Sequence, residues 1–200
     1  MVAPAAPDPT ASDSAIQAFF AENDSATLLQ ALLVHGVAGV ALAVLVVALA
    51  RQLAHPGGDA ARRTLLIAGL GAATVSIVQL GIEIALNRHV ARNGAPGTTA
   101  SLFQAINVAD TLKLVLLGMA IAAASRLAAG AGAFPRRLRG LGYALLPILA
   151  LGGLAFIIDS AALSVVLEAS LVLLLLWAAC AGRASARRPP RAQMTAVADR

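Results

Sequence analysis

The chain has 200 residues, of which 59% are hydrophobic and only 12% are charged. A soluble domain of this length could not bury so much apolar surface, so the composition excludes one and favours a protein whose solvent is the lipid bilayer. The formal net charge of +5 does not indicate a nucleic-acid-binding protein, because no folded basic domain accompanies it.

The N-terminal segment, residues 1–25, contains acidic residues and no basic residue. Because a basic start is missing, the segment does not have the pattern of a secretion signal. Its first part is rich in Pro, Ala and Ser, which predicts disorder. Ile16, Phe19 and Phe20 predict a short amphipathic turn on the membrane surface. We therefore expect an acidic, partly disordered tail outside the membrane.

Five apolar blocks follow, each close to the roughly 20 residues that cross the hydrocarbon core as a helix. They predict an all-α fold, a polytopic transmembrane helix bundle over residues 26–182. Asp59 predicts an N-cap for the second span, and Ser101 with Gln104 predicts a capping box that opens the third. The predicted spans are residues 26–51, 62–87, 101–126, 138–158 and 161–182.

Arginine is distributed unequally among the segments that flank the spans. The first and third connections and the C-terminal tail hold twelve arginines, whereas the second connection holds two. By the positive-inside rule, this predicts an N-terminus outside the cell and a cytoplasmic C-terminus. Residues 183–200 are predicted to form a disordered basic tail that contacts anionic lipids of the inner leaflet through Arg183, Arg187, Arg188 and Arg191.

The ionisable residues inside the spans fall in the third of the bilayer nearest the outer surface. Counting about 1.5 Å per residue from Arg126 places Lys113, the one lysine of the chain, about 10 Å below the outer boundary. A charge at that depth needs a partner, a cavity or a path to the interface. We predict an outward-facing site for a small ligand, protons or ions, formed by Glu83, Asp110, Lys113, Glu168, Gln79, Asn107 and His35.

Small and polar residues recur at helical spacing and predict which faces of the spans meet. The second span carries a stripe of small residues that ends in Gln79 and Glu83, and the third carries a comparable stripe that includes Asn107. In the fifth span, Ser164 and Glu168 share a face. Since small residues allow close approach and polar ones need partners, we expect these stripes to meet inside the bundle.

A purely structural interpretation of the polar layer stays open. Lys113 could extend its side chain to the interface, or Asp110 and Lys113 could neutralise each other on one helix. Glu83 could be solvated at the interface, and His35 could be a hydrogen-bonded packing residue. The chain would then be a packing or partner subunit in which charges only fix the helix register.

Several chemistries find no support in the sequence. His35 has no second intramembrane histidine with which to hold a haem, and metalloprotease, redox, nucleotide and serine-hydrolase motifs are absent. The single Cys180 excludes an intrachain disulfide. We predict a non-enzymatic protein without cofactor or metal, in which a pore would require a homo-oligomer. A membrane enzyme that acts on a lipid-linked substrate through its outer carboxylates is the alternative.

Three segments carry a resemblance to known proteins: HGVAGVALAV at residues 35–44, NVADTLKLVLLG at residues 107–118 and GGLAFIIDSAAL at residues 152–163. They resemble small multi-pass integral membrane proteins of high-GC, actinobacterial-type bacteria, a family of unknown function. The resemblance covers most of residues 16–182. It implies a location in the bacterial plasma membrane, and it implies no activity or catalytic residue.

Overall fold

Helices and short turns make up residues 7–186, the part of the chain that the computed structural model describes. The prediction of an all-α bundle with five spans is confirmed. The helical stretches long and apolar enough to cross a membrane are Asp24–Gln52, Asp59–Asn93, Pro96–Gly130, Arg136–Phe156 and Ala161–Ser185.

Each of the first two spans combines α-helix with one π-helical segment. The first is made of α2 (Asp24–Ala31), the π-helix η1 (Leu32–Val37) and α3 (Ala38–Gln52). The second is made of α4 (Asp59–Ala85), the π-helix η2 (Leu86–Val90) and the short α5 (Ala91–Asn93). A π-helical turn widens the backbone locally, and such turns are frequent at functional sites.

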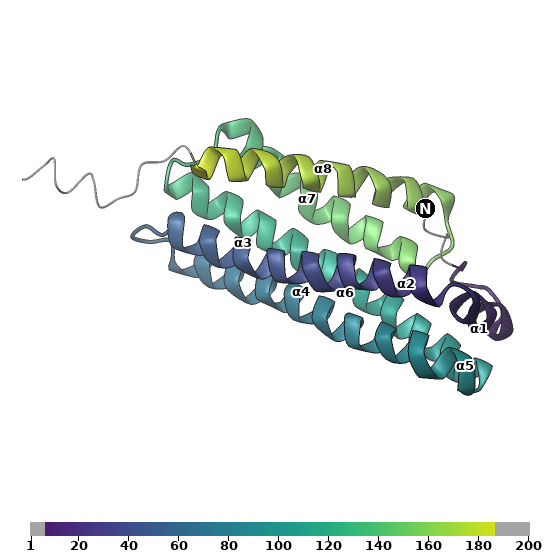
Figure 1. The fold of residues 1–200 in the computed structure, drawn as a ribbon. Coiled ribbons are helices and arrows are strands. Elements are labelled where there is room, and N and C mark those ends of the chain that lie inside the picture. Colours follow the sequence, from purple (N-terminus) through teal and green to yellow (C-terminus); the bar gives the residue numbers. More distant parts are fainter. Residues whose placement is uncertain (1–6, 187–200) are drawn as a thin grey trace, which may run out of the picture.

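The other three spans are α6, α7 with a 3-10 extension, and α8, while one short helix precedes the first span. Their bounds are α1 (Asp13–Glu22), α6 (Pro96–Gly130), α7 (Arg136–Gly153), η3 (Leu154–Phe156) and α8 (Ala161–Ala186). Figure 1 shows α1 and α5 at one end of the bundle and the loop between α3 and α4 at the other. We call the latter the arginine end, because the two arginine-rich connections and Arg183 lie there.

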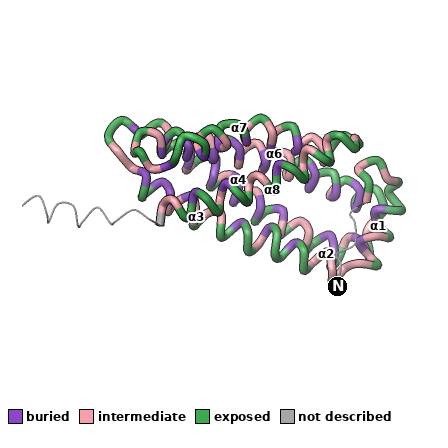
Figure 2. Tube along the Cα trace, turned by 90° about the horizontal axis from the view of Figure 1, so that it is seen from above, coloured by how far each residue is buried: buried purple, intermediate pink, exposed green. Residues whose placement is uncertain are grey.

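The helix α6 is central, since it packs against both α4 and α7, while α3 packs on α4 and α8 on α7. Leu127, Leu145 and Leu149 are among the fully buried residues of the main apolar core. Exposed residues, including aliphatic ones such as Ile67 and Leu175, run along the outside of the bundle (Figure 2). An apolar exterior around an apolar core is the arrangement expected where lipid surrounds the helices.

Small residues bring α3 and α4 into close contact. A Cβ on Gly69 of α4 would lie 2.4 Å from a methyl carbon of Val46 on α3. A Cβ on Gly39 of α3 would lie 3.0 Å from the Cβ of Ser76 on α4. The stripe of small residues on the second span is therefore a buried packing face, as predicted.

Two local predictions about helix starts are wrong. The N-cap residue of α4 is Gly58, and Asp59 is the first residue of the helix. The helix α6 begins at Pro96, so Ser101 lies inside it and its hydroxyl donates to the carbonyl of Gly97. Proline at the first turn is preorganised for a helix and needs no N–H partner there, which explains the earlier start.

The N-terminal segment also differs from its prediction. It forms α1, in which Ile16 and Phe20 are buried in a second apolar cluster with Phe103 and Ile106 of α6. Phe103 and Ile106, near the start of the third span, supply this apolar wall, so Ile16 and Phe20 pack on protein instead of lying on the membrane surface. Residues 1–6 and 187–200 are outside the described residues, and with them the predicted lipid contacts of Arg187, Arg188 and Arg191.

Candidate functional site

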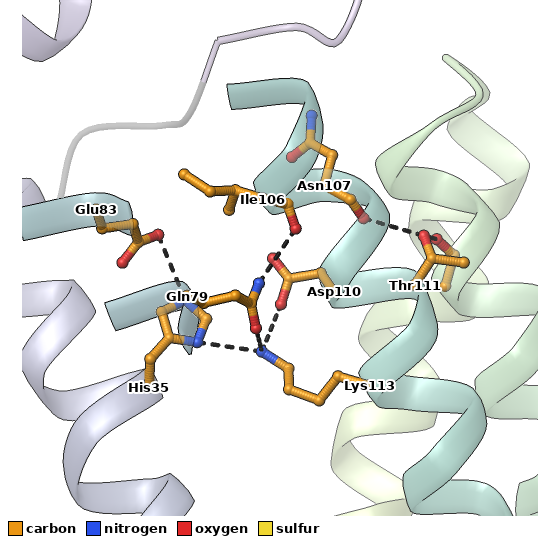
Figure 3. A network of polar contacts seen from close by, with 9 residues as sticks. His35, Gln79, Glu83, Ile106, Asn107, Asp110, Thr111 and Lys113 are labelled. Atoms are coloured by element: carbon orange, nitrogen blue, oxygen red, sulfur yellow. Dashed lines mark hydrogen bonds and ion pairs between the residues drawn. The ribbon is translucent and has the colours of Figure 1, made fainter. Parts of the chain in front are cut away.

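The ammonium group of Lys113 contacts side chains from three spans (Figure 3). Its Nζ donates to the carboxylate of Asp110, one turn earlier on α6, in a close ion pair. It also donates to Oε1 of Gln79 on α4 at 3.1 Å and lies 3.1 Å from Nδ1 of His35 in η1. The side chains of Lys113 and Asp110 are 15% and 14% exposed. Lys113 is thus paired inside the bundle and does not extend to the interface.

The contacts of His35 determine which of its ring nitrogens carries the proton. An ammonium group can only donate, so Nδ1 of His35 accepts from Lys113 and the proton of the neutral ring resides on Nε2. This Nε2 lies 3.4 Å from Oε1 of Glu83 on α4. The result is a continuous chain of charged and polar groups from Asp110 through Lys113 and His35 to Glu83. We call these four residues with Gln79 the polar network.

Side-chain bonds to backbone carbonyls fix the helices around the network. Gln79 is fully buried, and its Nε2 donates to the carbonyl of Ile106 on α6 at 3.1 Å. The hydroxyl of Thr111 on α6 lies 2.7 Å from the carbonyl of Gly153 at the end of α7. These contacts tie α4, α6 and α7 together at the depth of Lys113, so the network rests on a constrained frame.

Both π-helical segments lie beside the network. His35 is in η1 itself, and η2 begins directly after the turn that carries Glu83. Within η2, Asn87 is 1% exposed, and its Nδ2 donates to the carbonyl of Glu83 at 2.8 Å. Its side-chain oxygen accepts a hydrogen bond from the hydroxyl of Thr27 on α2. This hydrogen bond joins α2 to η2 next to the charged groups.

A cavity of about 450 Å³ adjoins the polar network at the end of the bundle opposite the arginines. This volume is within the range usual for small-molecule sites, about 300–1,000 Å³. Its polar wall includes His35, Glu83, Asn87, Asn107 and Asp110. Its apolar wall includes four of the five phenylalanines of the chain, Phe19, Phe20, Phe103 and Phe156.

The structure brings together six of the seven residues that the sequence proposed for a site: His35, Gln79, Glu83, Asn107, Asp110 and Lys113. The seventh, Glu168, is exposed on α8, does not line the cavity, and makes no hydrogen bond or ion pair within residues 7–186. The helix α8 faces the cavity through Ser164, Leu167 and Leu171. At about 100° per residue, Glu168 is turned by about 100° from Leu167 and by about 40° from Ser164, so it lies at the edge of this face and not within it.

Sequence reasoning missed Asn87 and the aromatic wall. Asn87 follows Glu83 at the same four-residue spacing by which Glu83 follows Gln79, so continuing the stripe to the last residue of the predicted span would have found it. The phenylalanines carried a weaker signal. Phe19 and Phe20 were assigned to the membrane surface, and nothing local in the sequence relates them to Phe103.

Comparison of the chain with protein-family models, with curated proteins and with solved structures gives no match in any of the three. The functional interpretation therefore rests on the cavity and the polar network. Within residues 7–186, no group of three or more His, Cys, Asp or Glu side chains is arranged to hold a metal ion.

Proposed function

We propose that this chain is a multi-pass membrane protein that binds a small ligand in the cavity beside the polar network. The main observation in support is that Glu83, His35 and Asp110, from three spans, all line one cavity of a size that suits a small ligand. Placing ionisable groups inside a bilayer costs free energy, so several such groups around one cavity indicate that they bind a ligand.

The unpaired part of Glu83 supports binding over a purely structural role. Asp110 and Lys113 would suffice to neutralise each other, but the site contains a second carboxylate. The Oε2 atom of Glu83 is buried and has no hydrogen-bond partner among the described residues. A buried acceptor without a partner costs about 1–3 kcal/mol, which a bound ligand or water would recover.

The interior between the network and the arginine end favours binding over conduction. This half of the bundle contains the main core cluster, in which Leu65, Leu127, Leu145 and Leu149 are fully buried. A buried apolar core offers few groups that could carry a proton or an ion across. The cavity is therefore proposed as a binding site on one side of the membrane.

The arginine distribution supports an orientation in which the cavity faces the outside of the cell and Arg183 faces inner-leaflet lipids. The resemblance to membrane proteins of high-GC bacteria would place the chain in a bacterial plasma membrane. An enzyme on a lipid-linked substrate is the second candidate, because two carboxylates line one cavity. Its weakness is that Lys113 neutralises Asp110, which would first have to lose this partner to act as a base.

Cysteine labelling tests whether the cavity is open to water. In a Cys180→Ala background, Asn107→Cys places a thiol in the cavity wall. The control variant Val108→Cys places a thiol at the next residue, on the exposed apolar surface of the bundle. N-ethylmaleimide reacts with the thiolate, which forms readily only in contact with water. We expect intact cells to label the Asn107→Cys protein and to leave the Val108→Cys protein unlabelled. An unlabelled Asn107→Cys protein would show a closed, dry interior and refute the proposal.

A further inference from the structure

We infer that the ligand is an organic cation with an apolar body, of the amine or quaternary ammonium class. The inference rests on the proposed function and names the chemistry of its ligand. Three features of the cavity lead to it: its charge, its aromatic lining and one unpaired carboxylate oxygen of Glu83.

The cavity wall carries a formal negative charge. It contains the carboxylates of Glu83 and Asp110, and only one ammonium group, that of Lys113, lies beside them. His35 is neutral in the tautomer that Lys113 imposes, so two negative charges face one positive charge. Lys113 does not itself line the cavity. In a medium of low dielectric constant, the surplus charge acts strongly on anything that enters.

The aromatic lining suits a cation better than a neutral apolar ligand. The ring centroid of Phe20 lies 5.3 Å from that of Phe19 and 5.9 Å from that of Phe103, both in edge-to-face geometry. The faces of aromatic rings attract cations, and quaternary ammonium groups are commonly bound between such rings. Aromatic residues are only 4% of the chain, so their concentration at this one cavity is selective.

The carboxylate of Glu83 keeps one oxygen without a partner in residues 7–186. Its Oε1 faces His35 at 3.4 Å, while its Oε2 is buried without a partner among the described residues. A cation would neutralise this carboxylate, and an amine could also donate a hydrogen bond to it. An anion would add a further negative charge to the wall. The cavity therefore discriminates by charge sign.

The test compares three compounds of similar shape. They are benzyltrimethylammonium, its uncharged carbon isostere neopentylbenzene, and the anion benzenesulfonate. Each is added to the Asn107→Cys protein in nanodiscs of neutral lipid, and protection from N-ethylmaleimide is measured. Equilibrium dialysis of radiolabelled benzyltrimethylammonium against the wild-type protein, with empty nanodiscs subtracted, then gives the affinity.

We expect saturable binding of benzyltrimethylammonium and protection by this compound alone. Glu83→Gln should weaken its binding at least tenfold, because the surplus charge of the wall is lost. The matched control is Glu168→Gln, which removes a carboxylate of α8 that does not line the cavity and should leave the affinity unchanged. Phe156→Leu in the lining should weaken binding several-fold, and Phe134→Leu, beside Trp177 in the main core, should not.

Failure of this inference can be told apart from failure of the proposed function. If neopentylbenzene or benzenesulfonate protects the thiol as well as benzyltrimethylammonium does, the cavity binds ligands without charge selection and the inference is wrong. If Glu83→Gln and Glu168→Gln lose affinity equally, binding depends on the overall surface charge and not on the cavity, and the inference is again wrong. If the thiol is labelled and no compound protects it, only the inference fails. If the thiol is not labelled at all, the proposed function fails too.

Discussion

Replacing Lys113 with methionine removes an ammonium group and keeps a long unbranched side chain. In the structure this group neutralises Asp110 and donates to Gln79, with His35 as a third neighbour. The variant leaves a carboxylate in the bundle without its counter-charge. Breaking a buried ion pair costs about 3–5 kcal/mol. Because Asp110 lines a cavity that water could enter, we expect the lower end, about 3 kcal/mol.

The double variant Asp110→Leu with Lys113→Met tests whether the cost comes from the pair. Apolar replacement of a whole buried pair is often close to neutral. Gln79 and His35 still lose their donor, and hydrogen bonds between membrane helices average about 0.6 kcal/mol each. We therefore expect the double variant to be about 1 kcal/mol less stable than wild type, and so about 2 kcal/mol more stable than Lys113→Met alone.

The single tryptophan provides the assay. Trp177 is 3% exposed and packs edge-to-face on Phe134, with ring centroids 6.1 Å apart, far from the substituted residues. Its fluorescence during titration with SDS in mixed micelles reports the free energy of unfolding. If Lys113→Met is as stable as wild type, the ammonium group is solvated at the interface. If the two single effects simply add in the double variant, the ion pair makes no contribution.

Other variants test the packing around the site by the same titration. Gly69→Ala should destabilise the bundle by about 1–3 kcal/mol, because the new Cβ would lie 2.4 Å from a methyl carbon of Val46. Val46→Ala should restore most of this loss, whereas Gly81→Ala on the same helix, with nothing within 4 Å of its Cβ, should cost nothing. Asn87→Ala should cost about 1–2 kcal/mol through its lost bond to Thr27, and adding Thr27→Val should then have little further effect.

The fold could be predicted from the sequence because the bilayer imposes one simple constraint. Each span must satisfy its backbone hydrogen bonds internally over a fixed thickness, so apolar length and composition identify it. Helix ends were less predictable, because they depend on contacts beyond the apolar stretch. The helix α6 begins at Pro96, where it can pack against α1, and the second span continues through η2 to Asn93. Apolar periodicity carries no information on these extensions.

The sequence predicted how deep the site residues lie in the bilayer better than it predicted the direction in which each side chain points. Counting from the arginines placed the polar residues in one layer, and four-residue spacing put Gln79 and Glu83 on one buried face. The same depth argument included Glu168, which is exposed on α8. Depth depends only on distance along one helix, whereas direction depends on how that helix rotates against its neighbours. For α8 the packing face is set by Ser170 and Trp177, which are buried.

The net charge of the cavity wall depends on which carboxylate pairs with Lys113. The sequence left open whether Asp110 on the same helix neutralises Lys113 or whether other residues of the polar layer, Glu83 among them, do so. In the structure Asp110, one turn earlier on α6, is its carboxylate partner, and Glu83 is reached only through His35. A partner on the same helix needs no alignment between helices, so it is the easier one to satisfy. Its presence leaves Glu83 without a counter-charge, and this surplus makes the cavity wall negative.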